Sequence, residues 1–238
     1  GDELLHRELF LILSQHLRQL PQNRPIEGRT VKRTCVSADV EYLPRRWIGY
    51  TGVHAVVWEG VDLSRMEHHA RAALRDYVTA GGHLVIAVGE HRSRLLKSAF
   101  LKNLLPCRLG PQEHRDLGRS LLGAEGRPPA VVTHLTPEAG TRVIRRDRDG
   151  SGLPLVVRQD VGGGAVTVVA FSLASSFCSK RTSLTDDVRQ SEAAVWDRWR
   201  KWIDPVLSPP VGLLQAQTGQ MVRQTGYRYL KQSATKRI

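Results

Sequence analysis

The sequence feature that most constrains the fold is the stretch from Val53 to Gly89. Val53–Trp58 is a short apolar run rich in β-branched residues, which is typical of a strand buried on both faces. Apolar residues then recur at helical spacing as far as Gly81-Gly82, where glycine can end a helix. Leu84–Val88 is a second apolar run. The order strand, helix, strand predicts a βαβ unit with two parallel strands.

The helix of this unit has one apolar face, predicted to pack on the sheet. Its members are Met66, Ala70, Ala73, Leu74, Tyr77 and Val78. Asp62 or Ser64 is the expected N-cap, because a short side chain with an oxygen can accept from the free N–H groups of the first turn.

The other elements follow from the same kinds of pattern. The spacing of leucines predicts a helix over Leu4–Leu20, and two more helices are expected near 93–105 and over Arg189–Ile203. Residues 107–129 have scattered glycines and prolines and are expected to be irregular. The predicted strands are Val31–Ser37, Ala130–Leu135, Thr141–Arg146, Leu155–Gln159 and Ala165–Phe171, the last two joined as a hairpin across Asp160–Gly164.

These elements predict the α/β class, as a flavodoxin-like three-layer parallel sheet with helices on both faces and a β-hairpin extension. We expect residues 1–30 to be an N-terminal helix and linker and residues 31–204 to be the α/β domain. Residues 205–238 are expected to be a basic, flexible tail.

The lengths of the apolar runs and the cysteine content argue against a membrane-spanning chain and against a site built from paired cysteines. No apolar run reaches the ~18–20 residues that span a bilayer, and the N-terminus lacks a signal-peptide pattern, so we expect a cytoplasmic protein or a fragment of a longer one. The three cysteines, Cys35, Cys107 and Cys178, form no paired motif. The sequence therefore predicts no metal and no cofactor.

The net charge of +12 allows two interpretations. One is a bias toward arginine spread over solvated faces, since most basic residues are interspersed with acidic ones. The other is a polyanionic partner. The segment from Pro205 to Ile238 has no acidic residue and supports a nucleic-acid contact through Arg223, Arg228, Lys231, Lys236 and Arg237.

One candidate site lies at the carboxyl ends of the two strands of the βαβ unit, where open α/β sheets bind their ligands. Glu59, Asp62, Glu90 and His91 follow these ends and are expected to line one crevice. They could serve a hydrolase that uses Glu59, Glu90 and His91, or they could be helix caps and solvated loop ends. No G-x-S-x-G, G-x-G-x-x-G or H-E-x-x-H motif occurs.

The residues Leu43-Pro44, Trp47, Gly49-Tyr50, VHAVVWEGVDLSR and ALRDYVTAGGHLVIAVG together resemble the class I glutamine amidotransferase-like superfamily. The resemblance covers roughly residues 40–204 and includes LPLVVRQDVGGGAVTVVAFSL before a helix that bears tryptophans. It is greatest to uncharacterised bacterial members carried by membrane-anchored proteins. This implies an extracytoplasmic, membrane-associated domain.

The resemblance also implies where a nucleophile would stand. Active members carry a cysteine in a G-x-C-x-G turn after the second strand of the unit, and here Val88 stands at that place. The His-x-Glu pair expected near the end of the chain is absent as well. Because glutaminase chemistry needs a thiolate, we expect a non-catalytic domain that binds a protein partner or a small ligand, with a nucleic-acid-binding module as the alternative.

Overall fold

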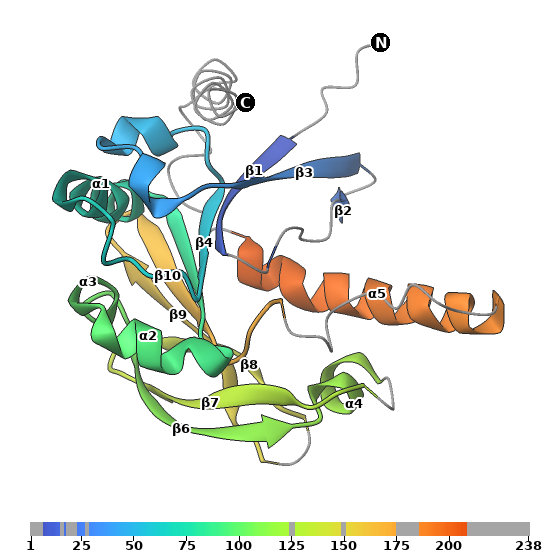
Figure 1. Cartoon of the computed structure of the whole chain (residues 1–238). Coiled ribbons are helices and arrows are strands. Elements are labelled where there is room, and N and C mark those ends of the chain that lie inside the picture. Colours follow the sequence, from blue (N-terminus) through green and yellow to red (C-terminus); the bar gives the residue numbers. More distant parts are fainter. Residues whose placement is uncertain are drawn as a thin grey trace, which may run out of the picture.

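The computed structural model describes residues 7–14, 17, 23–26, 29–123, 127–148, 151–174 and 186–208. Their largest feature is an eight-stranded sheet with the order β2-β3-β1-β4-β5-β10-β9-β8 (Figure 1). The strands are β1 (Arg7–Ser14), β2 (Asn23–Ile26), β3 (Arg29–Ser37), β4 (Ala55–Glu59), β5 (His83–Ala87), β8 (Arg142–Arg146), β9 (Pro154–Val161) and β10 (Gly164–Val169).

The centre of this sheet is parallel. Strands β3, β1, β4, β5 and β10 pair in parallel, while β2, β9 and β8 join antiparallel at the two sides. In chain order the parallel strands are arranged 2-1-3-4-5, which is the flavodoxin-like order. The parallel pairing of β4 with β5 confirms the predicted βαβ unit, and the antiparallel pairing of β9 with β10 confirms the predicted hairpin.

Helices cover both faces of the sheet, so the predicted fold class is confirmed. Figure 1 shows α1 (His68–Thr79) and α5 (Asp186–Leu207) on opposite sides of the strands. The shorter helices are α2 (Arg92–Lys97), α3 (Ala99–Lys102) and α4 (Leu117–Leu122), with 3₁₀ turns η1 (Val40–Tyr42), η2 (Trp47–Tyr50) and η3 (Gly89–His91).

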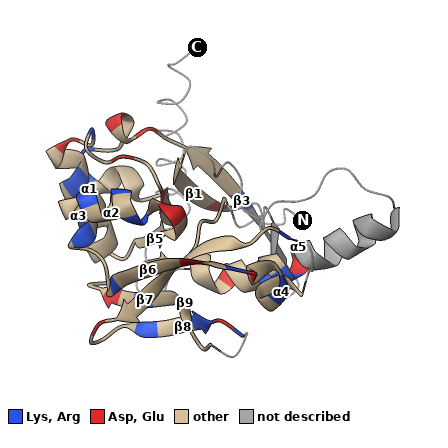
Figure 2. Ribbon diagram, turned by 60° about the horizontal axis from the view of Figure 1, so that its bottom comes forward, with Lys and Arg blue, Asp and Glu red and all other residues tan. Residues whose placement is uncertain are grey.

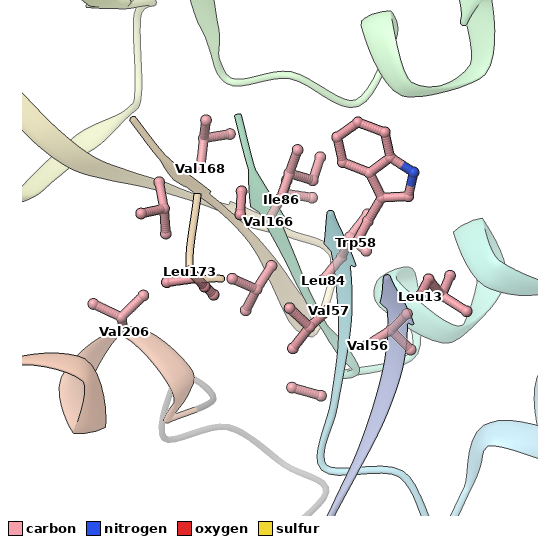
Figure 3. Packing of buried hydrophobic residues seen from close by; sticks show 14 of the residues in the cluster. Leu13, Val56, Val57, Trp58, Leu84, Ile86, Val166, Val168, Leu173 and Val206 are labelled. Atoms are coloured by element: carbon pink, nitrogen blue, oxygen red, sulfur yellow. The ribbon is translucent and has the colours of Figure 1, made fainter. Parts of the chain in front are cut away.

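The core consists mostly of the central strands themselves. Every residue of β4, β5 and β10 is buried, the polar Glu59, His83 and Thr167 included, as strands covered on both faces require. Figure 3 shows side chains of these strands packed together with Leu173 and with Val206 of α5. Burial of this apolar area is the main term that stabilises the fold.

A second, two-stranded antiparallel sheet lies beside the large one, and a bridge between Val132 and Phe171 joins it to the end of β10. It consists of β6 (Cys107–Arg115) and β7 (Ala130–Pro137). The prediction that residues 107–129 are irregular is therefore wrong for β6 and for α4. Strand β6 alternates weakly, with a glycine and a proline at its irregular register between Leu109 and Gln112, so its sequence lacks a clear strand pattern.

The predicted helix over Leu4–Leu20 is also wrong where the structure describes it. Residues Arg7–Ser14 form β1, which lies between β3 and β4 inside the sheet. The run Leu9–Leu13 is buried on both faces of the sheet, and a continuous apolar run fits the period of a helix as well as that of an inner strand.

Two smaller expectations about helices need correction. Helix α1 begins at His68, and Asp62 instead accepts from the Ser64 N–H at 2.8 Å in the preceding turn, so neither Asp62 nor Ser64 caps the helix. The helix predicted near 93–105 is interrupted at Ser98, whose hydroxyl accepts from the Leu101 N–H and caps α3. A serine at such a break competes with the helical backbone for hydrogen bonds.

Polar side chains lie buried between the sheet and the end of α5. Arg158 on β9 donates to the Pro205 and Val206 carbonyl oxygens, both at 2.9 Å, and so satisfies acceptors that the last turn of a helix leaves free. Its Nε also donates to Thr167 Oγ1, which lies 2.8 Å from His83 Nε2. Burial, with the nearby Arg158 and His54, lowers the pKa of His83 to about 3.

This arrangement predicts a loss of stability in acid. The unfolded chain takes up a proton at His83 near its ordinary pKa of 6.5, but the folded chain does so only near 3. The free energy of unfolding should therefore fall as the pH falls through this window, because the unfolded state then binds more protons. The substitution H83Q should make that acid slope shallower by about one proton, measured by urea unfolding across the pH range.

His69 provides the matched control, because it is exposed on α1. H69Q should leave the slope as it is. If the wild-type chain and H83Q lose stability in parallel between pH 6.5 and about 3, burial of a neutral His83 is not the cause of the acid slope.

Candidate functional site

Glu59 ends β4 at the carboxyl edge of the sheet, and the residue is 1% exposed. Its Oε1 accepts from Ser172 Oγ at 2.7 Å and from the Ala174 N–H at 3.0 Å. Its Oε2 accepts from Ser14 Oγ at 3.1 Å. The carboxylate therefore joins the end of β1, the end of β4 and the segment that follows β10.

The other three predicted crevice residues have different surroundings. His91 is buried on η3, and its ring lies against Gly60, where an added Cβ would come within 2.6 Å of the ring. Glu90 is exposed, with Oε1 3.6 Å from His91 Nε2. Asp62 is exposed in its turn, and the hydrogen bonds from Ser64, with Arg65 and Arg94 nearby, keep its pKa below the ordinary value.

The structure thus brings the His91 ring against Gly60, the residue that follows Glu59, while Asp62 and Glu90 lie at the surface. Gly60 adopts a φ of +68°, which lets the chain turn sharply after β4. Its carbonyl oxygen accepts from Arg94 Nη1 at 2.6 Å, so α2 is fastened to this turn as well. That these four residues bind a ligand stays a prediction.

The turn after β5 is where the resemblance would place a nucleophile. Val88 is fully buried there, and the residue with positive φ is the next one, Gly89, at +43°. A Cβ on Gly89 would lie 2.5 Å from the backbone nitrogen of Ser172, so no side chain fits without a backbone shift. The backbone of this turn is therefore packed against the segment that leaves β10.

The β6–β7 sheet closes the same turn from its other side. The carbonyl oxygen of Gly89 accepts from Thr133 Oγ1 at 3.0 Å and from Gln112 Nε2 at 2.5 Å. The Thr133 N–H in turn donates to the Ala170 carbonyl oxygen. The sequence does not predict Thr133 or Gln112 at the site. Strand β6 has no clear strand pattern, and no local pattern indicates that β6 and β7 pair with each other.

Neither of the two described cysteines belongs to the turn after β5. Cys35 is on β3, and Cys107, which begins β6, is 3% exposed. Burial, together with the Glu138 carboxylate, raises the pKa of the Cys107 thiol to about 12. A thiol of this kind is protonated at neutral pH and is a poor nucleophile. Cys178 lies outside the described residues.

A cavity of about 560 Å³ lies elsewhere, between β6, α4 and the end of β8. It is lined by Arg115, Asp116, Arg119, Ser120, Asp147 and Arg148, and none of the four predicted crevice residues takes part. Within the described ranges, no group of three or more His, Cys, Asp and Glu side chains is arranged to hold a metal ion.

Basic and acidic residues are interspersed along the ribbon of the described part of the chain (Figure 2). Several arginines at the surface are paired with acids, among them Arg45 with Glu67 and Arg142 with Asp160. The five basic residues predicted to contact nucleic acid, from Arg223 to Arg237, lie outside the described residues. No helix among the described ones is long and apolar enough to cross a membrane.

Comparison with known proteins finds similarity in structure alone. No protein-family model matches the chain, and no curated protein matches its sequence. Among solved structures, the cytoplasmic protein STM1381 from Salmonella typhimurium LT2 matches with a TM-score of 0.47 and 13% identity, over 84% of this chain and 99% of that one. The cytoplasmic protein STM3548 from Salmonella typhimurium gives 0.45 and 12%, over 83% and 98%.

A third match is the exo-β-1,4-mannosidase Op5Man5 from Opitutaceae bacterium strain TAV5, with a TM-score of 0.49 and 15% identity. It covers 86% of this chain and 36% of the mannosidase. These matches describe what the chain is similar to, and the assignment to the flavodoxin-like class stands on the order and direction of its own strands.

The geometry around Glu59 leads to a prediction about stability. E59A should lower the free energy of unfolding by about 3 kcal/mol, because it leaves one buried donor, Ser172 Oγ, and two partly buried donors, Ser14 Oγ and the Ala174 N–H, without their acceptor. E59Q keeps one carbonyl oxygen and should cost about 1–2 kcal/mol. Urea unfolding at neutral pH measures both.

The exposed Glu90 offers the control, and E90Q should change stability by no more than about 0.5 kcal/mol. If the Glu59 carboxylate instead serves a ligand and destabilises the fold, E59Q should be more stable than the wild-type chain.

Proposed function

We propose that this chain is a non-catalytic domain with an amidotransferase-like fold that acts as a binding or interaction module. The single observation that carries the proposal is the closed turn after β5. Gly89 there has no room for a side chain, and its carbonyl oxygen is held by Thr133 and Gln112. A nucleophile needs an exposed side chain at such a turn, with space beside it for the substrate.

The candidate acid and base of the hydrolase alternative do not favour catalysis either. The carboxylate of Glu59 already accepts three hydrogen bonds from the protein, and the donors come from the fold itself. A general base must reach a substrate proton at hydrogen-bond distance. Glu59 is 1% exposed, which opposes such an approach. Attachment to a larger membrane-associated protein is a proposal that the resemblance alone supports.

Thiol reactivity tests the proposal directly. We expect the full chain to hydrolyse glutamine no faster than buffer does. Cys107 should react with iodoacetamide far more slowly in the folded than in the unfolded chain at pH 8, because a pKa raised from 9 to about 12 lowers its thiolate fraction roughly a thousandfold. Mass spectrometry after timed alkylation measures each of the three cysteines separately.

The outcome that would overturn the proposal is equally specific. It is a cysteine that reacts faster than a free thiol, together with glutamine hydrolysis that its serine variant abolishes. C178S is the variant to include, since Cys178 lies outside the described residues, and C35S is the control.

A nucleic-acid-binding module is the second candidate, and the net charge of +12 favours it. The interspersed charges of the described part weigh against a broad basic face. If the tail binds phosphate, affinity for a fluorescent duplex or single strand should fall steeply with salt. Replacing Arg223, Arg228, Lys231, Lys236 and Arg237 by glutamine should then flatten that slope.

Under the primary proposal, anisotropy titrations at low salt show no saturable binding, and the glutamine variant behaves like the wild-type chain. Saturable binding with a slope that drops by several charges in the variant would instead establish the nucleic-acid module.

A further inference from the structure

The cavity between β6, α4 and the end of β8 is lined by charged and polar side chains. Its volume of about 560 Å³ lies within the roughly 300–1,000 Å³ that small-molecule sites occupy. We call it the β6–α4 cavity, and its described lining residues are Arg115, Asp116, Arg119, Ser120, Asp147 and Arg148. Guanidinium, carboxylate and hydroxyl groups therefore decide which ligand fits.

Hydrogen bonds hold the backbone around this cavity in place. Arg115 at the end of β6 donates to Asp147, in the turn after β8, at 3.4 Å. The Asp147 N–H donates to the Leu153 carbonyl oxygen at 2.8 Å, which fixes that turn. Asp116 caps α4 by accepting from the Arg119 N–H at 2.9 Å. The wall of the cavity is thus ordered without a ligand, and a preorganised site loses less entropy on binding.

The positive charges of the cavity are only partly compensated. Arg115 is paired with Glu113 at 2.5 Å and with Asp147 at 3.4 Å. Arg119 and Arg148 are exposed, and their guanidinium groups have no ion-pair or hydrogen-bond partner among the described residues. A guanidinium group binds phosphate oxygens through parallel N–H donors in a fixed fork. The cavity therefore offers two arginines to a phosphate group.

Two polar atoms of the lining are buried without a partner. They are Ser120 Oγ and Asp147 Oδ1, which form no hydrogen bond with any described residue, and the Asp147 side chain is 1% exposed. Because buried polar atoms nearly always have a partner, these two require one from outside the described chain. A hydroxyl group can donate to either atom. Side chains commonly change rotamer when a partner binds, which would give a ligand access to both.

The lining also distinguishes between kinds of phosphorylated ligand. None of its described residues is apolar or aromatic, so it offers no surface on which a base could stack or an acyl chain could pack. Asp116 and Asp147 would repel the successive phosphates of a nucleic acid, whereas sugar hydroxyl groups can donate to them. We propose that the β6–α4 cavity binds a sugar monophosphate, with its phosphate on Arg119 and Arg148 and its hydroxyl groups directed at the two carboxylates.

Isothermal titration calorimetry of the full chain tests the proposal, with a panel of pentose and hexose monophosphates as titrants. At least one sugar phosphate should bind saturably, with a dissociation constant of about 1 mM or lower. Glucose and inorganic phosphate each lack one half of the contacts, so each should bind at least about tenfold more weakly.

The double substitution R119Q/R148Q removes both guanidinium groups that face the phosphate. It should raise the dissociation constant of the sugar phosphate by at least about tenfold, because charge-assisted hydrogen bonds are lost. Both residues are exposed, so thermal unfolding should show an intact fold. The matched control is R45Q/R65Q, which removes the same charge from two exposed arginines outside the cavity and should leave binding unchanged.

The substitution D116N tests the hydroxyl contacts separately. Asparagine caps a helix as well as aspartate does, so α4 should stay folded. Removing the charge favours any anion, but it also replaces a carboxylate by a weaker acceptor for sugar hydroxyl groups. The preference for the sugar phosphate over inorganic phosphate should therefore fall, and an unchanged preference would contradict the assigned contacts.

Three further outcomes would overturn the proposal. One is that no sugar phosphate binds saturably, or that R119Q/R148Q binds it as tightly as the wild-type chain does. Another is that inorganic phosphate binds as tightly as the sugar phosphate, since the cavity would then be a simple anion site. The third is a fluorescent oligonucleotide whose affinity falls in R119Q/R148Q while no sugar phosphate competes with it, which would assign the cavity to a nucleic-acid backbone.

This ligand class rests on the binding role proposed above and not on the absence of catalysis. The alkylation assay decides catalysis separately, so the two proposals can fail independently.

Discussion

A buried carboxylate holds together the edge of the sheet at which proteins of this architecture bind ligands. Removing a charge from water costs several kcal/mol unless hydrogen bonds replace its hydration. Glu59 meets this condition with the hydroxyl groups of Ser14 and Ser172 and with the backbone N–H of Ala174. Its partners Ser14 and Ser172 are 45 and 113 residues away. The ends of β1 and β4 and the segment after β10 therefore depend on one side chain.

The position of this carboxylate also bears on function. In a sheet of the order 2-1-3-4-5, the strand order reverses between β1 and β4, and ligands of flavodoxin-like proteins bind at that point. Here the point is bridged by the hydrogen bond from Ser14 to Glu59. Next to it, the β6–β7 sheet is hydrogen-bonded to the Gly89 carbonyl. Donors and acceptors at this edge of the sheet are thus directed at the protein's own backbone and side chains.

How far the sequence predicts this fold depends on where each element's partners lie. The unit from Val53 to Gly89 was predicted because its strands and helix are adjacent in the chain and their periods differ clearly. The sequence of β1 predicts a helix because the run Leu9–Leu13 fits the helical period as well as that of an inner strand, and only its pairing with β3 and β4 on either side decides between them. Strand β6 has no clear strand pattern of its own, and its order comes from pairing with β7.

The candidate site shows the same limit at the level of single residues. Strand ends predicted that Glu59 and His91 would lie at one edge of the sheet, and the structure brings both to Gly60. Whether a carboxylate there is free for a ligand depends on Ser172 and Ala174, which no local pattern connects with it. Likewise, the spacing of apolar residues cannot tell that Tyr50 is buried while Trp47 and Ile48 are exposed. Both short turns of this segment contain aromatic residues, and the packing of Tyr50 on Tyr77 decides which of them is buried and which are exposed.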